Sequence, residues 1–198
     1  MAIDLEKLRP TDLTSNLNLT SFDCGNYDLN DFIKNNALDY QKQHIAQTTC
    51  ILYGGEIVAY YTLACDALYL LNKEKRKSGI PFIKGQYDTY PAIKICRMAC
   101  INNYKRNRIE SLLIKLIIGK VYTLNSENRI ACRFITVDAY PGAQKFYEKQ
   151  GFVYNLHPNY LIKTRHSLID RARKALAKLK GNEVALRPIS MRLNIFKD

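Results

Sequence analysis

The sequence predicts an α/β protein in which a central mixed β-sheet is flanked by helices. The second half of the chain alternates β-branched or aromatic runs with amphipathic helical segments, which is typical of strands covered by helices. Of the 198 residues, 47% are hydrophobic and 24% are charged, as in ordinary folded chains. This length predicts a single domain, residues 1–198, in which residues 156–187 form an insertion before the last strand.

The first half is predicted to form three strands and one helix. Strands are expected at residues 1–8, 48–53 and 56–71, and Gly54-Gly55 forms a two-residue hairpin turn between the last two. Residues 26–44 carry apolar side chains at a period near 3.6, which predicts an amphipathic helix. Residues 72–91 are rich in Lys, Arg, Gly and Pro and are expected to be an exposed basic connection without regular structure.

The second half contributes four more strands and three helices. Strands are expected at residues 92–101, 132–138, 152–155 and 189–196, and a polar turn at 102–106. Helices are expected at 109–124, at 143–150, where Gly151 ends the helix, and at 167–180. The last of these has one apolar side and one basic side, so it is the extra basic helix of the insertion.

Composition favours a cytoplasmic protein that does not cross a membrane. Six cysteines occur without a CxxC pair, mostly among apolar neighbours, which favours reduced thiols in a core and no metal site. The longest apolar stretch, residues 57–65, has about half of the ~20 residues that a bilayer crossing needs. Asp4 and Glu6 do not fit a secretory signal.

The formal net charge of +12 favours a polyanionic partner such as a nucleic acid, or an anionic cofactor. A solvated basic surface that keeps the protein soluble is the alternative. The candidate nucleic-acid contacts are two basic clusters: Lys75, Arg76 and Lys77, and Arg171, Lys174 and Lys178. The second cluster recurs at i, i+3 and i+7, so its members share one face of the predicted helix.

Two segments carry a resemblance to a known superfamily. A signature of the GNAT N-acetyltransferases is similar to one stretch of this chain, namely Val137-Asp138-Ala139 followed by Ala143-Gln144-Lys145-Phe146-Tyr147-Glu148-Lys149-Gln150-Gly151-Phe152. Four further segments resemble the TacT-like toxin branch, whose members acetylate the amino group of aminoacyl-tRNA. They are Phe22-Asp23-Cys24-Gly25, residues 58–63, Arg97-Met98-Ala99 and residues 188–196.

The resemblance implies a GNAT fold, acetyl-CoA as co-substrate, and aminoacyl-tRNA and a ribbon-helix-helix antitoxin as partners. Whether the chain forms a homodimer stays open. Two other functions also stay open: a GNAT enzyme that acetylates a protein or a small amine, and a non-catalytic RNA- or protein-binding module on this fold.

Tyr147 is the candidate general acid that the resemblance implies. Acetyl transfer from a thioester to an amine produces a thiolate, and a phenol near the sulfur can protonate it. The alternative is a tyrosine that only packs beside Phe146. No general base stands out among Asp88, Asp138, His44 and His157, so the amine is expected to lose its proton through water.

The resemblance places the cofactor-binding stretch at Met98, Ala99 and Cys100 and at Lys105, Arg106, Asn107, Arg108, Ile109 and Glu110. The family pattern, Q/R-x-x-G-x-G/A, uses bare glycine amides at a helix N-terminus to hold a pyrophosphate. Arg108 and Glu110 occupy both glycine positions here. Asn107 and Glu110 have the spacing of a helix capping box, whereas Lys105, Arg106 and Arg108 could hold phosphates through their side chains.

Overall fold

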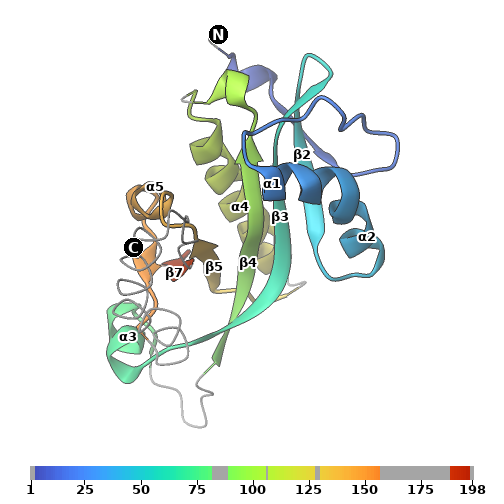
Figure 1. The fold of residues 1–198 in the computed structure, drawn as a ribbon. Helices are drawn as coiled ribbons and strands as arrows, with labels where there is room; N and C mark the ends of the chain where they lie inside the picture. Colours follow the sequence, from blue (N-terminus) through green and yellow to red (C-terminus); the bar gives the residue numbers. More distant parts are fainter. Residues whose placement is uncertain (1–2, 82–88, 106, 128–129, 157–187, 197–198) are drawn as a thin grey trace, which may run out of the picture. The chain divides into compact units, whose positions relative to one another are not determined.

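The computed structural model describes residues 3–81, 89–105, 107–127, 130–156 and 188–196. The chain divides into two compact units: residues 1–65 with 93–131 form the first unit, and residues 66–92 with 132–198 form the second. Seven strands follow the order β1-β2-β3-β4-β5-β7-β6, and the long strands β3, Glu56–Tyr69, and β4, Thr89–Cys100, have residues in both units. The prediction of a mixed sheet flanked by helices is confirmed (Figure 1).

The first unit is built on an antiparallel hairpin. Strand β2, Gln47–Tyr53, pairs with β3 from Gln47↔Leu63 to Tyr53↔Glu56, and β1, Arg9–Asp12, pairs with the other side of β2. Gly54 and Gly55 connect β2 to β3 with φ of 58° and 87°, the left-handed conformation that a tight hairpin turn requires. The predicted turn is therefore confirmed.

One helical run, residues 27–42, covers one face of this sheet. It consists of α1, Tyr27–Asp31, a π-helical turn at Phe32–Asn36, and α2, Ala37–Lys42. Asn26 caps its start, since its side chain accepts a hydrogen bond from the Leu29 amide. The predicted helix at 26–44 is confirmed, apart from the π turn.

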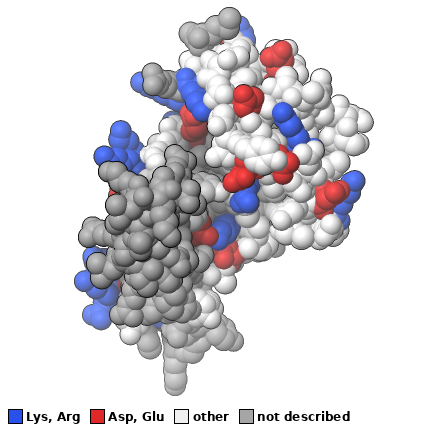
Figure 2. Space-filling model, viewed as in Figure 1, with Lys and Arg blue, Asp and Glu red and all other residues white. Residues whose placement is uncertain are grey.

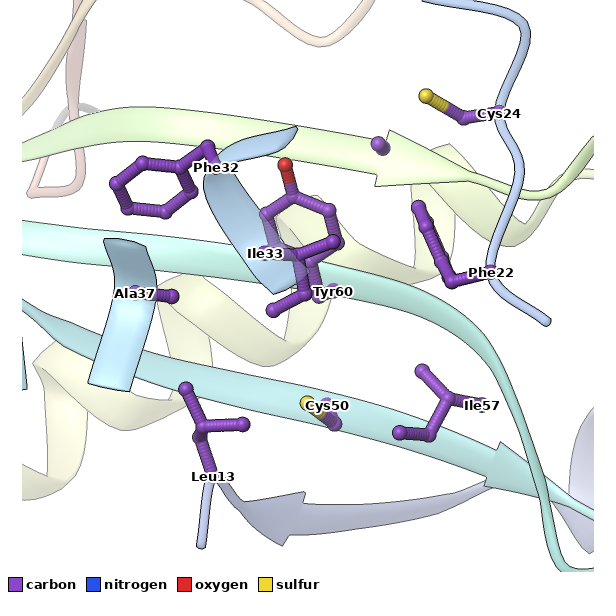
Figure 3. Close-up of a cluster of buried hydrophobic side chains, with 10 residues drawn as sticks. Leu13, Phe22, Cys24, Phe32, Ile33, Ala37, Cys50, Ile57 and Tyr60 are labelled. Carbon is purple, nitrogen blue, oxygen red and sulfur yellow. The ribbon is translucent and has the colours of Figure 1, made fainter. Parts of the chain in front are cut away.

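Aromatic rings fill the core beneath this helix (Figure 3). The Tyr60 ring lies between Phe22 and Phe32, with ring centroids 5.4 Å and 6.4 Å away, and its hydroxyl donates to the Leu29 carbonyl at 2.8 Å. Helix α4, Ile109–Ser126, lies on the opposite face of the sheet (Figure 1) and buries Ile109, Leu113, Ile114, Ile117 and Val121. The first unit thus has a helix–sheet–helix arrangement, which fixes the start of α4 relative to β4.

The described residues of the second unit form the remaining strands and two short helices. Strand β7, Ile189–Asn194, runs antiparallel between β5, Phe134–Ala139, and β6, Val153–Tyr154. Helix α5, Gln144–Lys149, precedes Gly151, whose φ of 86° confirms the predicted helix end. Leu68, Leu70, Tyr90, Ala92 and Phe134 form a separate hydrophobic cluster of this unit.

Helix α3, Asn72–Lys77, is a correction to the prediction of an irregular basic connection at residues 72–91. The side chain of Glu74 accepts a hydrogen bond from the Leu71 amide at 2.9 Å and so closes the first turn. Glu74 is 1% exposed, and its other oxygen accepts from Arg192 at 2.5 Å and from the Leu156 amide at 3.0 Å. A buried ion pair therefore holds α3 against β7.

Several further predictions are corrected or fall outside the described residues. The strand expected at residues 1–8 is wrong for Leu5–Lys7, which form a 3₁₀ helix capped by Asp4, and strand β1 begins only at Arg9. The turn expected at 102–106 contains another 3₁₀ helix, Asn102–Tyr104. The basic helix predicted at residues 167–180 lies outside the described residues. No helix among the described residues is both long and apolar enough to cross a membrane.

Candidate active site and cofactor loop

Tyr147 is the most buried aromatic residue of α5. It is 6% exposed, and its ring lies edge-on against Phe146 at 5.1 Å and against Phe152 at 5.2 Å. Phe146 is only half-buried, so Tyr147 rather than Phe146 anchors this helix in the second unit. Among the described residues, none makes a hydrogen bond to the Tyr147 hydroxyl.

Burial determines the protonation state of this phenol. Desolvation disfavours the phenolate and raises the pKa of Tyr147 from 10.0 to about 12. Tyr147 therefore remains a proton donor across the physiological pH range. A neutral phenol with no intramolecular acceptor among the described residues has the chemistry that a general acid for a thiolate needs.

The start of α4 differs from the capping box expected at Asn107 and Glu110. The residue at the N-cap is Arg108, and its own side chain makes no capping hydrogen bond. The Asn107 amide instead donates to the carbonyls of Tyr104, at 3.1 Å, and Lys105, at 3.4 Å. The predicted capping box is therefore wrong.

Arg108 adopts the backbone conformation that favours glycine. Its φ is 63° and its ψ is 14°, a left-handed conformation that non-glycine residues seldom adopt. The loop thus keeps a left-handed turn although the glycine of the family pattern is absent. The partial positive charge at the N-terminus of α4 can accept an anion beside the exposed Arg108 side chain.

A second loop supports this turn from within the first unit. The Lys105 ammonium donates to the Cys24 carbonyl at 2.7 Å, and the Asn102 amide donates to the Asp23 carbonyl at 3.0 Å. Asp23 accepts in turn from the Gly25 amide and the Asn30 side chain, which hold the pKa of this carboxyl below its usual value. Lys105 therefore orders the loop backbone in addition to adding charge.

Gly25 is required where these two loops meet. Its φ is 74°, and a Cβ there would lie 2.9 Å from the Asn102 side-chain oxygen. In the sequence, Phe22-Asp23-Cys24-Gly25 indicates only a resemblance, and the supporting role of this segment was missed. A glycine directly before the helix-capping Asn26 is the signal in the sequence that marks such a constrained turn.

The remaining predicted cofactor residues end β4. Met98 is half-buried, whereas Ala99 and Cys100 are buried. Desolvation raises the pKa of the Cys100 thiol to about 12, so this cysteine stays a protonated core residue. Arg106 lies outside the described residues. Ile109 is the first residue of α4, and its side chain is fully buried. These residues belong to the first unit, whereas Tyr147 belongs to the second.

The first basic cluster lies on α3. The Lys75 ammonium is 5.9 Å from the centre of the Tyr90 ring, so Lys75 makes a cation–π contact within the protein. Arg76 and Lys77 are exposed, and Figure 2 shows basic side chains where Figure 1 places α3. Elsewhere on that view, acidic and basic side chains are interspersed. Arg171, Lys174 and Lys178 lie outside the described residues.

His44, one of the groups considered as a base, has a structural role at the end of α2. Its φ is 56°, its amide donates to the Gln41 carbonyl, and the Ile45 amide donates to the Tyr40 carbonyl. This pattern is a Schellman motif, in which His44 occupies the position usually taken by glycine. Asp138 lies on β5, and Asp88 and His157 lie outside the described residues.

No protein-family model matches the chain, and no curated protein matches it. Many solved structures are similar to it, including the following three. AtaT complexed with acetyl-methionyl-tRNAfMet is 20% identical, with a TM-score of 0.66 over 76% of this chain and 89% of that one. A tyrosine-to-phenylalanine mutant of KacT is 20% identical, with a TM-score of 0.66 over 77% and 91%. AtaTR bound with AcCoA is 21% identical, with a TM-score of 0.64 over 78% and 91%. The chain therefore has the GNAT fold of these toxins.

Proposed function

We propose that the chain is a toxin that transfers an acetyl group from acetyl-CoA to the α-amino group of an aminoacyl-tRNA and so blocks translation. The left-handed backbone of Arg108 at the N-cap of α4 is the observation that carries this proposal. It preserves an anion-binding turn despite the absence of the glycines, which favours an enzyme over a non-catalytic module. Similar structures contain acetyl-CoA and an acetylated aminoacyl-tRNA.

Acetyl-CoA supplies an activated acyl group as a thioester when it is bound. The start of α4, with Arg108 and the Lys105-supported turn, would hold its phosphates. In the reaction the substrate amine forms a C–N bond to the acyl carbon, the C–S bond breaks, and the amine proton leaves to water. Tyr147 donates its phenolic proton to the departing sulfur and then regains a proton from water. Its raised pKa keeps the proton in place until charge develops on the sulfur.

The acceptor is proposed to be a nucleic acid because of the charge of the chain. The net charge is +12, and Arg76 and Lys77 project from a helix that the buried Glu74–Arg192 pair holds in place. Such a cluster suits phosphate contacts, because the helix that carries it is already held in place and binding loses little free energy to ordering it. The proposed setting is the cytoplasm, and the proposed protein partner is a ribbon-helix-helix antitoxin, since AtaT has been solved with the C-terminus of the antitoxin AtaR.

The test is an acetyl-transfer assay with the full chain, acetyl-CoA and a panel of aminoacyl-tRNAs, in which released N-acetyl amino acids are identified by mass spectrometry. At least one aminoacyl-tRNA should be acetylated. Exchanging Arg76 and Lys77 for Glu should raise KM for tRNA and flatten its salt dependence, by roughly 0.7–0.9 slope units for each phosphate that the variant no longer binds. Lys115→Glu, an exposed site on α4, is the control.

Two outcomes would overturn the proposal. Acetylation of free amines or proteins without acetylation of any aminoacyl-tRNA would indicate a different GNAT enzyme. Failure to bind acetyl-CoA by calorimetry at low salt would indicate a non-catalytic module.

A further inference from the structure

A cavity of about 230 Å³ lies in the first unit, under the C-terminal half of α4. Its walls come from the α2–β2 connection, the sheet and the helix, and include Ile45, Leu63, Ile93 and Leu124. Arg108, at the start of α4, is twelve residues before Lys120, or about 18 Å along the helix axis. The cavity is therefore separate from the proposed cofactor loop.

One charged side chain, that of Lys120, lines the cavity, and no Asp or Glu among the described residues does. Lys120 is exposed, and within the described part of the chain it forms no salt bridge. An ammonium beside an otherwise apolar cavity complements a ligand that has an apolar body and an anionic end.

The volume admits a ligand of several atoms. The cavity volume of about 230 Å³ is well above the ~10–15 Å³ that one water molecule needs by the same kind of measure, so a short carbon chain fits. The walls offer few polar partners, so an aliphatic or aromatic body fits better than a sugar or a nucleotide. We propose that this cavity is a binding site for a small monocarboxylate with an apolar tail of about six to eight carbons, whose carboxylate pairs with Lys120.

The geometry supplies its own reporter, because Cys65 lines the same cavity. Of the six cysteines, which form no disulfides, Cys65 is exposed, Cys96 is half-buried and the other four are buried. A bound ligand should shield the Cys65 thiol from alkylation. This readout needs neither acetyl-CoA nor tRNA, so its failure would leave the proposed function untouched.

The experiment measures the alkylation rate of Cys65 by peptide mass spectrometry as sodium octanoate is added to the full chain. Octanoate should slow the reaction at least fivefold, with saturation. Lys120→Gln should raise the apparent Kd about tenfold, the scale of one charge-assisted hydrogen bond. Lys115→Gln, an exposed lysine of α4 that does not line the cavity, should leave the Kd unchanged. Ala64→Phe, which places a large side chain at the cavity wall, should abolish protection in a chain that circular dichroism shows to be folded.

Three results would overturn the proposal. The first is an alkylation rate that does not respond to octanoate. The second is equal protection in the Lys120→Gln and Lys115→Gln variants. The third is equal protection by octanoate, octanol and octylammonium, which would mean that the cavity takes apolar chains without regard to charge.

Discussion

Replacing Gly25 by alanine tests whether the Phe22–Gly25 loop supports the proposed cofactor loop. The new Cβ has two costs. A left-handed backbone costs a non-glycine residue about 1–2 kcal/mol. In addition, the Cβ would lie 2.9 Å from the Asn102 side-chain oxygen, so this side chain must move away from Asp23.

Gly54→Ala is the matched control for the backbone cost. Gly54 has a φ of 58°, but a Cβ there meets nothing within 4 Å. The backbone cost should lower the unfolding free energy of both variants in urea by about 1–2 kcal/mol. Gly25→Ala should lose more than Gly54→Ala, because only its Cβ disturbs the Asn102–Lys105 turn. If re-forming this turn costs about 1 kcal/mol on binding, the Kd for acetyl-CoA should rise about fivefold in Gly25→Ala and stay unchanged in Gly54→Ala.

Calorimetric titration with acetyl-CoA measures this difference. Combining Gly25→Ala with Asn102→Ala should restore most of the affinity, because the shortened side chain makes room for the new Cβ. Equal affinity in Gly25→Ala and Gly54→Ala would refute the supporting role of this loop.

Three further outcomes are expected. Tyr147→Phe should lower kcat about 10²- to 10⁴-fold and leave the affinity for acetyl-CoA unchanged. Tyr122→Phe, the control at a partly exposed tyrosine of α4, should leave kcat unchanged. Equal kcat values for the two variants would make Tyr147 a packing residue. Because the pKa of Tyr147 is raised from 10.0 to about 12, its contribution to stability is present below pH 10 and is lost as the pH rises towards 12. The urea midpoint of the wild type should therefore fall more steeply over that pH range than the midpoint of Tyr147→Phe. Parallel curves would contradict the pKa shift. Glu74→Gln should cost about 3–5 kcal/mol, because it removes the carboxylate charge that faces the buried Arg192 guanidinium. The Glu74→Gln, Arg192→Met double variant should recover part of this loss, and a loss below about 1 kcal/mol for Glu74→Gln would show that the pair is solvated.

Elements that depend on local sequence could be predicted. The β2–β3 hairpin follows from a β-branched run and Gly54-Gly55, and α4 follows from apolar residues on more than half of its circumference. These signals lie within a few residues of each other. The same holds for Gly151 at the end of α5.

Elements that depend on distant residues could not be predicted. Helix α3 is short and basic, and Glu74 reads as a surface residue until Arg192, 118 positions later, is known to be its partner. The spacing of Asn107 and Glu110 predicts a capping box from local sequence, but Arg108 takes a left-handed conformation and the helix starts after it. The sequence singled out Tyr147, whereas its raised pKa depends on burial that only the fold defines.

The position of residues 157–187 between β6 and β7 has a consequence for the evolution of the chain. Tyr154 pairs with Met191, and the Asn155 amide donates to the Ser190 carbonyl at 3.1 Å, so the two strands that flank this segment in the sequence are bonded to each other. Closing a loop of about 30 residues costs only about 2 kcal/mol more than closing a tight turn. This site can therefore gain, lose or exchange whole segments while the sheet keeps its register, which makes it a place where a new binding surface can be acquired without rebuilding the fold.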